Sequence, residues 1–406
     1  MYLGGTWFAV TACCVRRSLS SQCVRLHLRV LRWCGFVRVR GGGGALQRAH
    51  AHYRAAVLAL VTFYLAQECI YAYQVRDDLE KVSRVMYLLL CHVTSLVKQL
   101  VFLKRAARIE HMLDGLDEPL FNQTRGAHGR LLVEGALSAR RLLKAYAGTA
   151  VLTCALWTTF PVLYHARAQP VLMPLWLYVD YNSSHTIFFM VMAYSFGVTA
   201  LVGIANTTMD GFIAAILEQC KIQLRILRMN FEELPQRAAE LARGRKDLTY
   251  NDVLMKIFLD CLQHYQKITE TLKTLQNIFD TAIFIQFGVG GWILCLAAYQ
   301  IVGLELLSLE FTSTVLFIVC ILTELFLYCY YGNDVRDESE RVVESIYSME
   351  WSRVPLPLRR SLLLVMVRAK RPLRPVVGVA IPLSLDTFVK IIKSSYSFYA
   401  VLRQTK

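Results

Sequence analysis

Charged residues are scarce in this chain. Of its 406 residues only 18% are charged, whereas 55% are apolar. This is more apolar side chain than one soluble core of this length can bury. The apolar residues gather in stretches of about 20, the length that crosses a bilayer core of ~30 Å. The sequence therefore predicts an all-α, polytopic membrane protein with seven spans, at Ala55–Tyr73, Ser83–Leu103, Ala145–His165, Ile187–Ala205, Thr281–Leu304, Phe311–Tyr331 and Val377–Leu402.

Acidic residues are absent from positions 1–54, which contain nine arginines. Lys and Arg are also frequent between spans two and three, four and five, and six and seven. The alternate connections are poor in them, and Arg167 is the only Lys or Arg between His165 and His185. Because Lys and Arg resist translocation, this asymmetry predicts a cytoplasmic amino terminus and, after seven crossings, an extracellular carboxy terminus. The basic charge is thus explained by topology, and we expect contact with membrane lipids and no nucleic-acid partner.

Motifs for catalysis and metal binding are also missing. The sequence contains no HExxH, GxSxG or CxxC, and His50 and His52 have no other potential ligands near them. We therefore expect no enzyme activity, no catalytic residues, no metal and no cofactor. The predicted outer loops contain no cysteine, so an extracellular disulfide framework is not expected. Of three N-x-[ST] matches, at Asn122, Asn182 and Asn206, only Asn182 falls in an outer loop and is a candidate glycosylation acceptor.

Four segments follow from this topology. Residues 1–54 form a basic cytoplasmic segment, and 55–220 contain the first four spans. Residues 221–376 contain cytoplasmic helices with spans five and six, and 377–406 the final helix. Within the first segment Arg25, Arg29 and Arg32 recur at helical spacing, which suits a helix on the inner leaflet or one packed against the bundle. We expect cytoplasmic helices such as Asn251–Gln276 to pack on one another.

Ionisable residues inside spans indicate contacts with protein or water, because each is costly in lipid. We expect a structural role for Glu68, whereas Glu324 suits either helix packing or a water path. In the final span a polar stripe recurs at 100° per residue, formed by Asp386, Lys390, Lys393, Ser397 and Gln404. In one interpretation Asp386 and Lys390 form an ion pair and the stripe is buried against other helices. Alternatively the stripe lines an aqueous pathway, where Val401 could close a pore by dewetting.

The carboxy-terminal quarter resembles the insect odorant receptor family. The resemblance is carried by LFLYCYYGNDVRDESERVVESIYSMEW (Leu325–Trp351), RAKRP (Arg368–Pro372) and PLSLDTFVKIIKSSYSFYAVL (Pro382–Leu402). It implies an odorant-gated, non-selective cation channel in the plasma membrane of olfactory sensory neurons, in which four subunits surround a pore lined by their final helices. The cytoplasmic helices would form an anchor domain. The second cytoplasmic loop lacks the long insertion of the family's co-receptor, which implies a tuning subunit that assembles with that co-receptor.

The resemblance also implies site residues. Val401 matches the hydrophobic gate position, with Gln404 near the outer mouth and Ser397 along the pore. Lys390 and Lys393 would repel cations in such a pore, so pairing with Asp386, or with Glu340 and Glu344, is an alternative. Odorants would bind in the outer half of the bundle, where the candidate residues are Tyr87, Ala150, Thr153, Trp157, Met190, Tyr194 and Phe317.

Two other receptor classes fit less well. A G-protein-coupled receptor would need the opposite orientation, a D/E-R-Y type run after span three and an NPxxY in span seven, and the sequence has neither motif. A gustatory receptor of the same superfamily is the nearer alternative, and the Ser-Tyr-Ser ending of the final helix argues against it.

Overall fold

The computed structural model describes residues 18–38, 44–167, 171, 173–178, 181, 184–244, 249–306, 308–378 and 380–404, without the side chains of residues 79, 80 and 402–404. The described chain is almost entirely helical, which confirms the all-α class. Its helices are α2 (Gln22–Trp33), α3 (Gly44–Gln74), α4 (Leu79–Lys104), α5 (Ala106–Leu116), α6 (His128–Ala166), α7 (His185–Glu232), α8 (Leu234–Arg243), α9 (Tyr250–Val302), α10 (Leu309–Ser348), α11 (Leu356–Ala369) and α12 (Leu385–Gln404).

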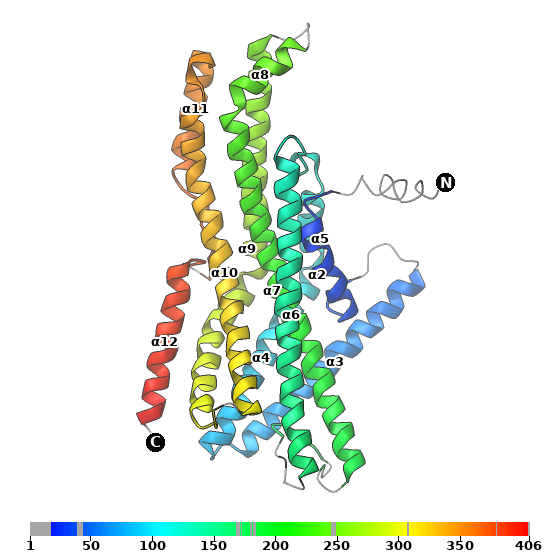
Figure 1. Ribbon diagram of the computed structural model, residues 1–406. Coiled ribbons are helices and arrows are strands. Elements are labelled where there is room, and N and C mark those ends of the chain that lie inside the picture. Colours follow the sequence, from blue (N-terminus) through cyan, green and yellow to red (C-terminus); the bar gives the residue numbers. More distant parts are fainter. Residues whose placement is uncertain are drawn as a thin grey trace, which may run out of the picture.

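Helices α6, α7, α9 and α10 run along the long axis of the molecule (Figure 1), and α7 packs against all three of the others. Nearly every residue of α7 from Ala205 to Leu217 is buried. This section of α7 is buried around its whole circumference, so it lies inside the bundle, where its polar side chains face other helices. Helix α3 crosses the bundle obliquely and leaves many apolar side chains exposed, as a helix facing lipid would.

Six described helices are long and apolar enough to cross a membrane, namely α3, α4, α6, α7, α9 and α10. They contain the first six predicted spans, except that α9 ends at Val302, before the predicted Leu304. Helix α12 has 20 residues, enough for ~30 Å, but Asp386, Lys390, Lys393 and Arg403 lower its mean hydropathy. Its membrane crossing, as the seventh span, stays a prediction.

The polar segments extend the spanning helices. Helix α9 is continuous from Tyr250, so the predicted run Asn251–Gln276 and span five form one helix. It packs on α7 and α8, as expected for helices that pack on one another. Figure 1 shows α8 and α11 together at the end of the molecule opposite the carboxy terminus.

The amino-terminal helix α2 packs against α6 and α7, which favours the bundle-packing interpretation of this segment. Its His27 is fully buried, and desolvation lowers the pKa of that imidazole to about 4. The preceding Ser20 is held by Gln223 of α7, whose Nε2 lies 3.2 Å from the Ser20 hydroxyl. The Gln223 amide oxygen lies 2.8 Å from Nε2 of His264 on α9. One buried network thus joins the amino-terminal segment to two long helices.

A buried ion cluster joins α4, α7 and α10. Nζ of Lys98 donates to Asp210 at 2.6 Å, to Glu324, and to the side-chain oxygen of Asn206 at 3.1 Å. The hydroxyl of Tyr328 donates to the same Asp210 carboxylate. The side chains of Lys98, Asp210 and Glu324 are at most 1% exposed. Each charge has a charged partner, which is the condition for retaining charges away from water.

The final helix begins later than predicted. Instead of starting at Val377, the chain first forms a short antiparallel ribbon of β1 (Val376–Val377) and β2 (Ile381–Pro382). Gly378 turns this ribbon with φ +61°, a region that favours glycine, and Pro382 is poorly suited to a helix interior. The hydroxyl of Ser384 then accepts from the backbone N–H of Thr387 and caps α12.

The ion cluster predicts a large stability effect of Lys98→Met. The change leaves two buried carboxylates without their cation, a loss of about 3–5 kcal/mol, and should lower the melting temperature of the purified protein strongly. Lys221→Met is the matched control, since the Lys221–Asp334 pair is 28% and 21% exposed and water screens its charges. Equal losses in both variants would contradict this account of the cluster.

Candidate ligand-binding site

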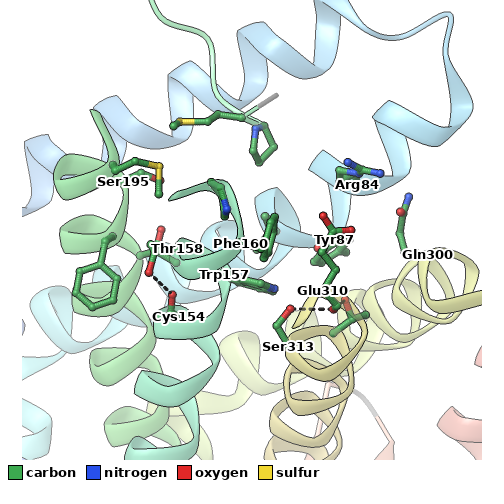
Figure 2. A pocket seen from close by; sticks show the side chains of 18 of the residues that line it. Arg84, Tyr87, Cys154, Trp157, Thr158, Phe160, Ser195, Gln300, Glu310 and Ser313 are labelled. Atoms are coloured by element: carbon green, nitrogen blue, oxygen red, sulfur yellow. Dashed lines mark hydrogen bonds between the residues drawn. The ribbon is translucent and has the colours of Figure 1, made fainter. Parts of the chain in front are cut away.

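Two adjoining cavities lie near the end of the bundle where α6 leads to α7 and α9 leads to α10. The larger, of about 140 Å³, is lined by residues of α3, α4, α6, α7, α9 and α10 (Figure 2). The smaller, of about 60 Å³, continues toward the ion cluster and is lined by Asn206 and Glu324 among others. Leu88, His92 and Trp157 line both cavities. Since Glu324 both pairs with Lys98 and lines a cavity, the two roles considered for it are compatible.

Three aromatic rings form one wall of the site. The ring centroids of Tyr87 on α4 and Trp157 on α6 each lie 5.2 Å from that of Phe317 on α10. Tyr87 and Trp157 are 6.2 Å apart and inclined to each other, within the range of favourable aromatic contacts. Pro161, one turn after Trp157, also lines the larger cavity. Proline has no N–H, so it cannot donate to the carbonyl of Trp157 as the helix would otherwise require.

The larger cavity is also lined by polar groups from α3, α4 and α7, in addition to Arg84, Gln300 and Glu310. The hydroxyl of Tyr64 lies 3.1 Å from that of Ser195 and 3.4 Å from that of Thr199. Nδ1 of His92 lies 2.9 and 2.8 Å from the two carboxylate oxygens of Glu68. Both members of this Glu68–His92 pair are buried. The cavity therefore combines an aromatic wall with a small polar one, a composition typical of sites for small organic molecules.

Some of the predicted ligand-binding residues line the two cavities and others do not. Tyr87 and Trp157 line the larger cavity, and Ala150, Thr153, Trp157 and Phe317 line the smaller one. Tyr194 lines neither cavity and donates a hydrogen bond of 2.8 Å to the Gln67 side chain. Met190 also lines neither and is 60% exposed. Met192 takes its place at the cavity, because residues two apart on a helix point about 200° away from each other.

Sequence reasoning missed the partners of two residues that it had identified. It singled out Glu68 and Glu324, but neither His92 nor Lys98, although both ionisable residues lie within the second span. Their presence in an apolar stretch was the available signal. The third member of the ion cluster, Asp210, lies beyond the predicted end of span four at Ala205, so it was not among the ionisable residues considered inside spans.

The charged side chains of the α12 stripe have no ion-pair partner within the described chain, and the Ser397 hydroxyl donates only to the Lys393 carbonyl of its own helix at 3.0 Å. Asp386, Lys390, Lys393 and Ser397 are exposed, and none of them forms an ion pair with a described residue. The proposed partner Glu340 is instead 2.9 Å from Arg336. The interpretation that the stripe is buried against other helices of the same chain is therefore wrong for these residues.

The opposite face of α12 supplies its packing. The ring of Phe398 stacks on Trp292 of α9 at 5.1 Å, while Ser395 is buried near Gly291. On the stripe side Val401 is 61% exposed. The side chain of Gln404 lies outside the described residues, as does Asn182.

The described residues contain no group of three or more His, Cys, Asp or Glu side chains able to hold a metal ion. The other two N-x-[ST] asparagines are held by contacts within the protein, Asn122 being half-buried and Asn206 buried. The Asn122 amide donates to the Leu116 carbonyl at 2.8 Å, and Asn206 is 5% exposed beside Lys98.

Comparison with known proteins gives consistent results. Residues 78–396 match the family model described as 7tm Odorant receptor. Odorant receptor Or1 of Anopheles gambiae is 20% identical over 93% of this chain and 94% of its own length. Odorant receptor 10 of Aedes albopictus is 21% identical over 95% and 98%. The olfactory receptor OR5 of Machilis hrabei has a similar fold, with a TM-score of 0.80, 15% identity and coverage of 94% and 98%. Its structure in complex with eugenol gives a TM-score of 0.81 at 14% identity and the same coverage.

The cavity geometry predicts different effects of two substitutions in the purified protein. Trp157→Ala removes a ring shared by both cavities, so it should weaken binding of a small aromatic probe such as aminoanthracene about tenfold, or ~1.4 kcal/mol. Met190→Ala should leave the probe's dissociation constant unchanged, because Met190 lines neither cavity. Fluorescence titration measures both constants. A larger effect of Met190→Ala would contradict the cavity assignment.

Proposed function

Since this chain belongs to the 7tm odorant receptor family, we propose that it is the odorant-binding subunit of a ligand-gated, non-selective cation channel. The observation that carries this proposal is the polar stripe of α12, which is exposed and whose charged side chains form no ion pair with a described residue. Such a face suits a helix that meets water or other subunits, and it would be costly against lipid. The family is one of receptors, and we expect no enzymatic activity.

Odorants are proposed to bind in the two cavities between α4, α6, α7 and α10. The aromatic wall of Tyr87, Trp157 and Phe317 suits small hydrophobic molecules, and Ala150 and Thr153 limit the depth of the site. Eugenol, with which OR5 of Machilis hrabei was solved, is a small aromatic molecule of this kind. We keep Tyr194 as a residue that supports Tyr64, and no longer propose a ligand contact for Met190.

The pore is proposed to lie on the axis of a tetramer, lined by the stripe of α12 from each subunit. Ser397 would face the conduction path, Val401 would form an apolar constriction that closes by dewetting, and Gln404 would lie near the outer mouth. Lys390 and Lys393, having no acidic partner within the described chain, would meet acidic groups or water of neighbouring subunits. The long helical ends of α7, α9 and α10 with α8 and α11 would form the cytoplasmic anchor.

We propose a plasma-membrane location in olfactory sensory neurons, with the amino terminus in the cytoplasm and the carboxy terminus outside. The supporting observation is the alternation of basic and base-poor connections. In this orientation the cavities lie toward the outer side, and Asn182 remains a candidate glycosylation site. The partner subunit would be the odorant co-receptor.

Expression in cells with and without a co-receptor tests the proposed function. We expect odorant-evoked cation current only when both chains are present, and we expect it to persist when G-protein signalling is inhibited. The current is recorded from whole cells during application of a broad odorant panel, with surface labelling of the chain as the control for expression. A full response of this chain alone that a G-protein inhibitor abolishes would contradict the proposal.

A further inference from the structure

The Glu68–His92 pair is a buried polar element of the cavity wall, in a site whose larger cavity is also lined by Arg84, Gln300 and Glu310. His92 is 5% exposed and Glu68 is 1% exposed, and His92 lines both cavities. The imidazole also makes an edge-on contact with the ring of Tyr64, with 5.5 Å between the ring centroids. The ring is therefore fixed in position at the junction of the two cavities.

The contact with Glu68 assigns the two ring nitrogens. Both carboxylate oxygens lie within 2.9 Å of Nδ1, and a carboxylate only accepts hydrogen bonds, so Nδ1 carries the proton. In the neutral imidazole Nε2 is then an acceptor. Nε2 has no hydrogen-bond partner among the described residues, although the ring lies at the cavity wall. It is thus an acceptor without a donor among the described residues, on a ring that lines both cavities.

Other hydroxyls around the larger cavity are already engaged. Those of Tyr64, Ser195 and Thr199 contact one another, and the hydroxyl of Thr158 donates to the Ala155 carbonyl at 2.8 Å. The hydroxyl of Tyr87 and the indole N–H of Trp157 are donors by their chemistry. These donors can serve the oxygen of an alcohol or of a carbonyl compound equally. An acceptor distinguishes the two, since only an alcohol can donate to it. His92 is the acceptor shared by both cavities, whereas the Glu310 carboxylate lines the larger cavity alone.

We propose that the Glu68–His92 pair selects ligands that carry a hydroxyl donor over carbonyl compounds of the same carbon skeleton. Nε2 of His92 accepts the ligand O–H, and Glu68 is a positioning residue that keeps the proton on Nδ1. A carbonyl ligand of equal shape leaves the buried acceptor unpaired, and sites built to pair a hydroxyl discriminate strongly against analogues that lack it. This inference rests on the proposed odorant-binding function and names its ligand class.

Matched odorant pairs test the inference in cells that express the chain with a co-receptor. The pairs are menthol with menthone, benzyl alcohol with benzaldehyde, and cyclohexanol with cyclohexanone. We expect the alcohol to be about tenfold more potent than its carbonyl partner in each pair that activates the receptor. His92→Phe keeps a ring but removes the acceptor, so it should abolish this preference by weakening the alcohol response alone.

Two further variants separate selection by His92 from general damage. Glu68→Gln keeps an oxygen that can accept from Nδ1–H, so it should preserve the preference, whereas Glu68→Leu should remove it. Thr158→Val is the matched control in the cavity wall, because its hydroxyl is engaged by its own helix, and it should shift both members of a pair by the same factor. Surface labelling establishes that each variant reaches the membrane. If His92→Phe fails to reach it, Glu68→Leu tests the inference instead.

Four outcomes would overturn the inference. In the unaltered chain, these are equal potency of the alcohol and carbonyl members of each pair, or no response to any pair. In His92→Phe, they are an equal change in the potency of both members, or the loss of a preference for the carbonyl member. The last result would mean that Nε2 carries a proton. A chain that still responds to other odorants would retain its proposed function in each case. Silence toward the whole broad panel, with the chain and co-receptor at the surface, would overturn the proposed function itself.

Discussion

The ammonium group of Lys98 lies where water does not reach it, and it binds carboxylates from two other helices. An unpaired charge in such a place costs several kcal/mol, so α4, α7 and α10 can pack in the membrane only in the register that brings Lys98, Asp210 and Glu324 together. Apolar side chains alone specify this register weakly, because lipid tails solvate them as well as a neighbouring helix does. The cluster therefore fixes the register of α4, α7 and α10. Other sections of the same three helices line the cavities.

The cavities follow from that register. Between the ion cluster and the α9–α10 connection, the same three helices and α6 present aromatic and small side chains that do not fill the space between them. The smaller cavity reaches Glu324 itself, so a molecule bound beside Trp157 would lie next to charges that hold the bundle together. A ligand could in this way change the relative positions of α7 and α10. Helix α12 packs on α9 and α10, and Gly332 of α10 permits the close approach of Leu383 just before α12.

The fold class and six spanning helices were predictable from sequence, because an apolar stretch of about 20 residues has few alternatives to a membrane helix. The stripe of α12 was also readable, since its period is that of a helix. The rest depended on tertiary contacts. Met190 was chosen as an apolar residue on the right helix, but only the rotation of α7 decides that Met192 faces the cavity. Lys98 and His92 have no periodic pattern, and their partners lie on other helices far away in sequence.

The start of the final helix could be predicted only in part, since Gly378 and Pro382 are sequence signals against a helix at Val377 but do not show the ribbon that replaces it. Val377 is apolar and continues the hydrophobic run, yet the ribbon that precedes α12 is set by a glycine turn and by contacts with other helices. Gln276 of α9 donates to the carbonyl of Val376 at 3.2 Å, and the Asp280 carboxylate accepts from the backbone of Gly378 at 2.7 Å. Such contacts are visible only once α9 and the ribbon lie side by side.

Substitution of Val401 by serine tests most directly whether α12 lines a gated pore. Val401 lies on the exposed stripe, so a polar side chain there should stabilise water at the constriction. With the co-receptor present, Val401→Ser is expected to raise odorant-independent current or to alter ion permeability ratios. Val389→Ser, the same change about 18 Å further from the carboxy-terminal end of the helix at a residue 45% exposed, lies away from the proposed constriction and should leave both unchanged. If Val401→Ser reaches the surface and its basal current and permeability ratios equal those of the unaltered channel, this residue is not the gate.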